Sequence, residues 1–219
     1  MNPLKKLFFW RRYTTKQNER YWANRKINWE KDYNSTWGSP HRFAISSILR
    51  TFNWFSLIEI GCGSGANIIN IIKSFPGRKL QVGGFDVNKD AIEAVNKAIK
   101  GGMFRVGSGS SIFMGDKSTD VTLTDMMLVY VGPLKINNYL KEIVRITRNY
   151  IVLHEFHHKS WFQRWKLRVF SGRHSYNYDK LLDSLDCYNI IKYKMPVFEE
   201  DNDQKFRYII VAQVPRKNV

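Results

Sequence analysis

Residues 57–68, LIEIGCGSGANI, constrain the fold of this chain more than any other stretch. An apolar, strand-like run passes through glycines at positions 61, 63 and 65 and then continues with helical character. Glycine leaves room for a ligand near the backbone, and a helix that starts there offers free N–H donors. Ligands of open α/β sheets bind at the carboxyl ends of the strands, so this turn is predicted to hold a nucleotide-like cofactor.

Segments of strand and helix character alternate between residues 56 and 155, which predicts a parallel sheet with helices on both faces. Asn88 is the predicted N-cap of the second helix. The predicted strands cover residues 56–60, 79–87, 103–106, 120–131 and 150–155, and the predicted helices cover 66–74, 90–100 and 135–149. Two last strands, 189–196 and 206–216, are expected to form an antiparallel pair at the sheet edge.

The length of 219 residues suits one domain with a sizeable core. We divide that domain by the character of its segments. An N-terminal helical cap covers residues 1–50 and a cofactor-binding core covers residues 51–155. A basic, aromatic lid follows over residues 156–185, and the last two strands occupy residues 186–219.

The charge of this basic protein is concentrated in two regions. Lys and Arg number 35 against 19 Asp and Glu, a net charge of +16. Residues 1–50 hold eleven Lys or Arg and three acids, and residues 156–180 hold six Lys or Arg and one acid. Such patches indicate a polyanionic partner, which is nucleic acid, an anionic membrane surface or a phosphorylated substrate. The alternative is a surface that only keeps the protein soluble.

The start of the chain, MNPLKKLFFWRRYTTK, lacks the apolar core and the cleavage site of a signal peptide. No apolar run reaches the roughly 18 residues of a membrane span. The two cysteines are too few for a disulfide framework. These features predict a cytoplasmic protein, with peripheral contact at a membrane as an alternative location.

Acidic and polar residues follow several predicted strands. Asp86 ends the second strand, where an acid can accept both ribose hydroxyls of an adenosine. Gly61, Gly63 and Ala66 also satisfy the permissive dinucleotide fingerprint. Glu59, inside the first strand, would suit a cationic ligand better than a pyrophosphate. Polar groups at later strand ends, Asp125 and His154-Glu155, build a site for a second substrate and favour S-adenosylmethionine over a dinucleotide.

Five motifs of the chain resemble those of class I S-adenosylmethionine-dependent methyltransferases. They are EIGCGSG (59–65), FDVN (85–88), DVTLTDMMLVY (120–130), LKEIVR (140–145) and YIVLHE (150–155), and the resemblance covers residues 40–155. It implies a Rossmann-like, doubly wound α/β fold with a seven-stranded, mostly parallel sheet and an antiparallel last strand. It also implies a transferase of the EC 2.1.1 class that converts S-adenosylmethionine into S-adenosylhomocysteine.

The resemblance assigns roles to several residues. Glu59 and the three glycines line the methionine end, Asp86 binds the ribose, and Val87 packs on the adenine. The family usually has an acid after the third strand for the adenine amine, but here Ser108 occupies that place. Ser108, Ser111 or a backbone carbonyl is expected to substitute. The complete predicted cofactor set is Glu59, Gly61, Cys62, Gly63, Gly65, Asn67, Asp86, Val87, Asn88, Ser108, Ser111 and Asp125.

Methylation of a hydroxyl requires alignment of the acceptor and removal of a proton. The predicted catalytic residues are His154, Asp125 and Glu155, with His157 and His158 as further candidate bases. In the structural alternatives, His154 is a core histidine and Asp125 caps a turn. His154, His157 and His158 lie at and after the end of a predicted strand, and no cysteine or further cluster of acids joins them. No metal site is therefore predicted.

The pattern around the fourth strand bears on the acceptor. It lacks the Asn/Asp-Pro-Pro-aromatic motif of amino methyltransferases that act on adenine or glutamine. A cytosine C5 methyltransferase needs a cysteine nucleophile, and neither Cys62, in the glycine turn, nor Cys187, before the sixth strand, is placed for that role. The motifs resemble the small-molecule and glycan-biosynthesis branch, which implies O-methylation of a small-molecule or glycan substrate, anionic or lipid-linked. The alternatives are an RNA methyltransferase and a non-catalytic, cofactor-binding partner subunit.

The stretch WFQRWKLRVF, residues 161–170, combines aromatic and basic residues at helical spacing. Three interpretations stay open for it. It covers an anionic small substrate, lies on a membrane as a basic amphipathic helix, or contacts RNA through phosphates and bases. Packing of its tryptophans in the core of the lid is a fourth interpretation.

Overall fold

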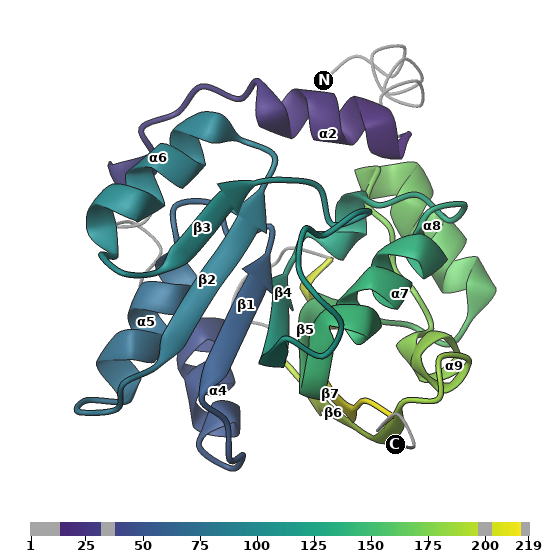
Figure 1. The fold of residues 1–219 in the computed structure, drawn as a ribbon. Helices are drawn as coiled ribbons and strands as arrows, with labels where there is room; N and C mark the ends of the chain where they lie inside the picture. The colour runs from purple at the N-terminus through teal and green to yellow at the C-terminus, as the bar shows by residue number, and fades with distance from the viewer. Residues whose placement is uncertain (1–13, 32–37, 197–202, 216–219) are drawn as a thin grey trace.

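The computed structural model describes residues 14–31, 38–196 and 203–215, and Figure 1 shows their arrangement. Seven strands form one sheet in the order β3-β2-β1-β4-β5-β7-β6. β7 runs antiparallel to both of its neighbours, and the remaining pairs are parallel, which confirms the predicted fold class. The strands are β1 (Ser56–Ile60), β2 (Gln81–Asp86), β3 (Met103–Val106), β4 (Thr119–Asp125), β5 (Thr147–Phe156), β6 (Tyr188–Lys194) and β7 (Arg207–Gln213).

Helices cover both faces of the sheet (Figure 1). One face packs against α4 (Pro40–Leu49), α5 (Ala66–Ser74) and α6 (Lys89–Ala98), and the other against α7 (Ile136–Ile146) and α9 (Tyr178–Asp183). Helix α2 (Thr15–Ala23) crosses the carboxyl ends of the central strands, and α8 (Trp161–Ser171) lies at the same end. Two short 3-10 turns, η2 (Leu128–Tyr130) and η3 (Gln204–Phe206), complete the described elements.

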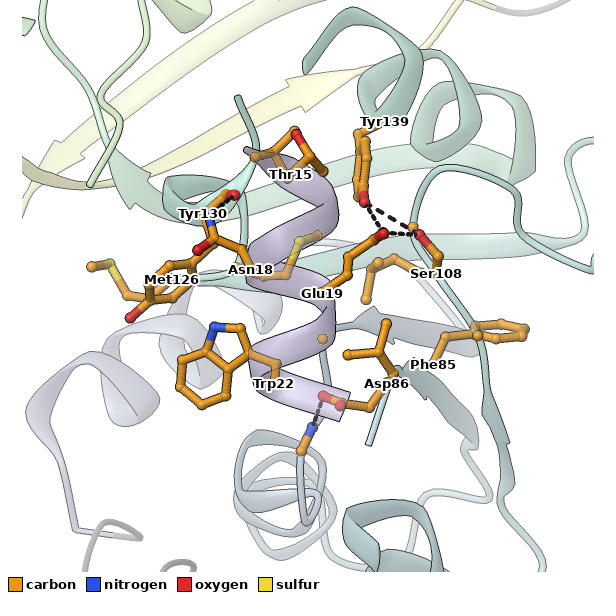
Figure 2. A pocket seen from close by; sticks show the side chains of 18 of the residues that line it. Thr15, Asn18, Glu19, Trp22, Phe85, Asp86, Ser108, Met126, Tyr130 and Tyr139 are labelled. Atoms are coloured by element: carbon orange, nitrogen blue, oxygen red, sulfur yellow. Dashed lines mark hydrogen bonds between the residues drawn. The ribbon is translucent and has the colours of Figure 1, made fainter. Parts of the chain in front are cut away.

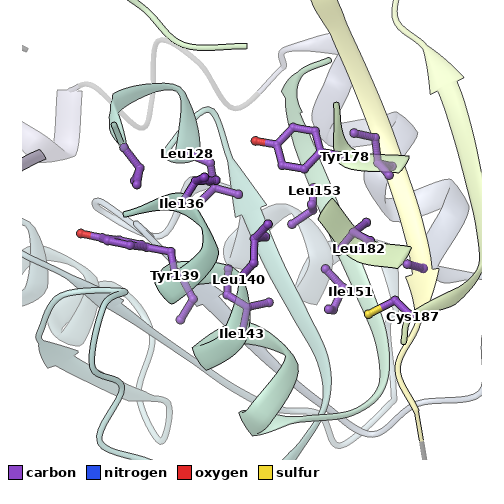
Figure 3. Packing of buried hydrophobic residues seen from close by; sticks show 14 of the residues in the cluster. Leu128, Ile136, Tyr139, Leu140, Ile143, Ile151, Leu153, Tyr178, Leu182 and Cys187 are labelled. Atoms are coloured by element: carbon purple, nitrogen blue, oxygen red, sulfur yellow. The ribbon is translucent and has the colours of Figure 1, made fainter. Parts of the chain in front are cut away.

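Helix α7 shows how the sequence pattern produces the packing. Its apolar residues recur three and four positions apart, so they share one face of the helix. That face packs on Leu153 of β5 and Leu182 of α9 (Figure 3). Leu140 is fully buried there, and a leucine in such a place typically contributes about 2–5 kcal/mol to stability. The buried residues of α7 are Ile136, Tyr139, Leu140, Ile143 and Ile146.

The predicted fourth strand, 120–131, is too long. β4 ends at Asp125, Met126 takes a left-handed φ of 54°, and residues 128–130 form η2. The backbone N–H groups of Met127 and Leu128 donate to Oε1 of the buried Glu155 carboxyl group, each at 3.0 Å. Because these donors are used by a side chain, the apolar run turns away from the sheet and still remains buried.

Other boundaries differ less. Asn88 is the N-cap of α6, as predicted, because its side chain accepts from the Ala91 N–H. β5 begins at Thr147, inside the segment predicted as the end of a helix. The edge pair of β6 and β7 is confirmed. Parts of the predicted N-terminal cap, residues 1–13 and 32–37, and residues 197–202 between the last two strands lie outside the described residues. Within the described ranges, no helix is long and apolar enough to cross a membrane.

Candidate functional site

A cavity of about 290 Å³ lies at the carboxyl ends of β1, β2 and β4 (Figure 2). Helix α2 forms one wall, and the glycine turn and the loops after β2, β3 and β4 form the others. Six of the predicted cofactor residues line it: Gly61, Gly63, Asp86, Val87, Ser108 and Asp125. The remaining six, Glu59, Cys62, Gly65, Asn67, Asn88 and Ser111, are not among its lining residues.

The glycine turn requires glycine at two positions for steric reasons. Gly61 and Gly65 have φ of 78° and 84°, in the left-handed region that favours glycine. A Cβ at Gly61 would lie 2.6 Å from Cγ of Met127, and one at Gly65 would collide with Val95. The N–H groups of Gly61 and Cys62 both donate to the Phe85 carbonyl, at 2.7 and 3.1 Å. The turn is therefore held against the end of β2.

Asp86 connects the glycine turn to the cavity. One carboxylate oxygen accepts from the Gly63 N–H at 2.9 Å, and the other accepts from the Asn88 N–H at 2.8 Å. Burial raises the pKa of Asp86, and these backbone donors oppose that shift. A carboxylate has about four acceptor positions, so each oxygen retains one for a ligand hydroxyl. The position suits the two hydroxyls of a ribose.

Asn88 anchors the wall formed by α2. While its Oδ1 caps α6, its Nδ2 donates to the carbonyls of Trp22 and Arg25 at 2.7 and 2.9 Å. At the other end of α2, Thr14 and Gln17 form a capping box. Asn18 in the middle of the helix donates to the Tyr130 carbonyl at 2.7 Å. Contacts on both sides of the cavity therefore hold α2 in place.

Glu19 of α2 is a site residue that the sequence analysis missed. Its Oε1 accepts from the Ser108 hydroxyl and the Tyr139 hydroxyl, both at 2.5 Å (Figure 2). Burial, together with the bond to Glu19, raises the pKa of Tyr139. The carboxylate thus lies beside Ser108, where the sequence analysis expected no acid. The available signal was the capping box of α2, which predicts a helix that carries Glu19.

Glu59 lies beneath the cavity rather than in its wall. It is buried, its Oε1 accepts from Asn67 Nδ2 at 2.6 Å, and its Oε2 has no partner among the described residues. Burial raises the pKa of Glu59 to about 8. Asn67 also donates to Asp125 at 2.9 Å and therefore links the two acids.

Asp125 lies between two histidines. His154 Nδ1 is 2.5 Å from one carboxylate oxygen, and His41 Nε2 is 3.1 Å from the other. Burial acts to raise the pKa of Asp125, but the contacts with His154 and His41 outweigh it and hold the pKa well below its usual range. Burial lowers the pKa of His154. The group is therefore an ionised acid that accepts from two imidazoles, and His41 was absent from the predicted set.

The ligand atoms of His41, Asp125 and His154 lie within 4.8 Å of one another, close enough to consider a metal. The two imidazole rings are stacked, with centroids 4.6 Å apart and planes 15° from parallel. Imidazole lone pairs lie in the ring plane, so two stacked rings direct them along separate planes. This arrangement suits a hydrogen-bonded acid better than a shared ion.

The three predicted catalytic residues have different positions. Asp125 lines the cavity. His154 is 1% exposed, and its Nε2 has no partner among the described residues. Glu155 is fully buried and holds the start of η2 through Met127 and Leu128, a structural position. Burial raises the pKa of Glu155 to about 8.

The raised pKa of Glu155 predicts a pH-dependent stability. Between its ordinary pKa near 4.5 and about 8, the folded state binds this proton and the unfolded state does not. The free energy of unfolding therefore falls as pH rises through this window, by at most about 1.4 kcal/mol per pH unit. Glu155→Gln is expected to reduce the slope of the profile measured by chemical denaturation between pH 6 and pH 8, and Glu59, whose pKa is also raised to about 8, keeps its own contribution. The exposed control Glu93→Gln keeps the wild-type slope, and identical slopes in all three proteins would contradict the assignment.

Solved methyltransferase structures share this fold. An S-adenosylmethionine-dependent methyltransferase from Methanosarcina mazei superposes with a TM-score of 0.58 at 20% identity, over 77% of this chain and 96% of that chain. Geranyl diphosphate methyltransferase in complex with GPP and sinefungin superposes with a TM-score of 0.64 at 12% identity, over 91% of this chain and 98% of that chain. A chain from the complex between the Haloferax volcanii Trm112 methyltransferase activator and a methyltransferase superposes with a TM-score of 0.60 at 11% identity, over 87% of this chain and 100% of that chain. At these identities the likeness shows the fold alone.

A sequence comparison agrees with the fold. Residues 57–150, from β1 into β5, match the family described as a methyltransferase domain. No curated protein matches the chain. The family match covers the strands from β1 into β5, and the solved methyltransferases share the fold of the chain.

Proposed function

We propose that this protein transfers the methyl group of S-adenosylmethionine to an oxygen atom of a small-molecule or glycan acceptor. The observation that carries the proposal is Asp125, ionised on the cavity wall and hydrogen-bonded to His41 and His154. A sulfonium methyl needs little covalent help from a protein, whereas a hydroxyl acceptor must lose a proton. Asp125 orients a neighbouring imidazole, and that imidazole takes the proton.

When bound, the cofactor supplies an activated methyl group. The cavity has a complementary group for each part of the cofactor. Asp86 accepts the ribose hydroxyls, and Val87 packs on the adenine. Glu19 accepts the adenine amine, because its carboxylate lies beside Ser108 on the same wall. The glycine turn, with Gly61 and Gly63 in the wall, leaves room for the methionine end.

The proton of the acceptor passes to an imidazole rather than to Asp125. A carboxylate with so low a pKa is a weak base, but it orients a neighbouring imidazole and stabilises its protonated form. The His41 side chain is 19% exposed and that of His154 is 1% exposed. His41 is the more exposed of the two imidazoles and is therefore assigned as the base, and its bond to Asp125 through Nε2 leaves Nδ1 to take the proton. His154 supports Asp125 from below.

RNA methylation is the second candidate, favoured by the clustered positive charge. Labelled S-adenosylmethionine added to a host extract, followed by separation into RNA, protein, lipid and small-molecule or glycan fractions, distinguishes the two. Label in the small-molecule, glycan or lipid fraction is expected. Label confined to RNA would overturn the proposed acceptor class. No transfer into any fraction by a protein that binds the cofactor would favour a non-catalytic partner subunit.

Glu19→Gln is expected to lower the affinity for S-adenosylmethionine about tenfold, because a charged acceptor becomes a neutral amide. Calorimetry measures the loss, with the exposed Glu30→Gln as the matched control. An analogue with a carbonyl in place of the adenine amine sharpens the test. The wild type should discriminate against it, and the variant should discriminate less. Equal discrimination by both proteins would remove Glu19 from the adenine site.

A further inference from the structure

Helix α8 exposes four large aromatic side chains to solvent. Trp161 is 70% exposed, Phe162 48%, Trp165 49% and Phe170 74%, whereas the helix buries only Leu167. We define these four aromatic residues and Lys166 as the α8 face. A buried aromatic side chain gains about 1.5–3 kcal/mol over an exposed one, so a helix that leaves four of them in water favours a binding partner.

Three aromatic side chains of the α8 face, Trp161, Phe162 and Trp165, form a continuous band. The rings of Phe162 and Trp165 stack with centroids 5.9 Å apart, and Trp161 packs edge-on against Phe162 at 6.1 Å. Lys166 Nζ lies 5.9 Å from the Phe162 ring centre and thus places a cation beside the band. Tryptophan, phenylalanine and lysine side by side on one helix face are typical of a helix that lies in the interface of a bilayer.

Charge selects the chemistry of the occupant. Residues 159–173 contain five Lys or Arg and no acid, and two of the five, Lys159 and Arg173, pair with Asp179 and Asp203 from outside this segment. An anionic surface with an apolar interior satisfies both the cations and the aromatic rings.

The α8 face lies close to the cavity. Leu167, on the buried side of α8, packs with Val129 of η2, and Met126 and Tyr130 pack against the same cluster. Met126 and Tyr130 also line the cavity. Helices α8 and α2 lie at the same end of the molecule in Figure 1. A surface in contact with α8 would therefore be next to the site.

We infer that the α8 face binds an anionic phospholipid membrane and that the protein methylates an acceptor presented at that surface. The second half of this inference rests on the proposed function, and the first half does not. The second half specifies the acceptor class as a lipid-linked or membrane-associated molecule. The cavity then receives its cofactor from water and its acceptor from the bilayer side.

Cosedimentation with vesicles tests the inference on the full chain. The wild type is expected to partition into phosphatidylcholine–phosphatidylglycerol vesicles at least about tenfold more strongly than into phosphatidylcholine alone. Replacing Trp161 and Trp165 by Ser is expected to reduce binding to the mixed vesicles about tenfold or more. The matched control replaces Phe113 and Leu134 by Ser, because these residues are 81% and 97% exposed but lie outside α8. Control and wild type should bind alike.

Three outcomes would overturn the inference: equal partition of the α8 variant and the wild type, equal binding to neutral and anionic vesicles, or loss of RNA binding in the α8 variant with vesicle binding unchanged. Thermal unfolding of the same preparations shows that each variant is folded, and calorimetry with S-adenosylmethionine measures cofactor binding. Calorimetry also separates the two proposals. A protein that binds the cofactor but not vesicles refutes the membrane site alone, and one that binds vesicles but not the cofactor refutes the proposed function alone.

Discussion

Asp86→Ala is expected to weaken S-adenosylmethionine binding by about 100-fold or more. The substitution removes two charge-assisted hydrogen bonds to the ribose, each worth about 1.5–3 kcal/mol. It also leaves the Gly63 and Asn88 N–H groups without their acceptor, so the glycine turn loses one of its connections to β2. Both effects act on the same ligand, which makes this the largest expected change in affinity. Calorimetric titration with the cofactor measures it.

Asp183→Ala is the matched control, because Asp183 is an exposed acid at the end of α9. Its cofactor affinity should equal that of the wild type. Thermal unfolding of both variants separates lost binding from lost fold. Wild-type affinity in a folded Asp86→Ala protein would show that the cavity does not bind the cofactor through this acid.

Asp125→Asn is expected to reduce turnover by about 10²–10⁴-fold, the range typical for loss of acid–base assistance. The amide keeps the size of the side chain but no longer stabilises a protonated imidazole. The KM for the cofactor should change much less than kcat, because Asp86 and Glu19 remain. The acidic limb of the pH–rate profile should also move to lower pH, a shift that a merely structural role for Asp125 would not produce.

Transfer of label from S-adenosylmethionine into the accepting extract fraction measures this turnover. Asp183→Asn provides the control and should retain wild-type rates. His41→Gln should resemble Asp125→Asn if His41 takes the proton. Full turnover in both site variants would exclude the cluster from the reaction and leave alignment of the acceptor as the only contribution of the protein.

Local pattern was sufficient for most of the architecture. Alternating strand and helix segments, the Asn88 cap and the glycine turn each depend on residues within a few positions of one another. The position of Asp86 at the cavity followed from the same rule, because carboxyl ends of parallel strands share one edge of a sheet. The fourth strand was predicted too long because its end depends on Glu155, 27 and 28 residues away.

The sequence by itself determined the class of fold, the glycine turn and the acid at the end of the second strand, because local periodicity and backbone chemistry specify them. Only the tertiary structure brought Glu19 to Ser108 and Tyr139, across separations of 89 and 120 residues, and His41 to Asp125 across 84. Such pairs leave no periodic signal, since they depend on where α2 and α4 pack against the finished sheet. The same packing buries Leu167 and leaves the aromatic side chains of α8 facing outward.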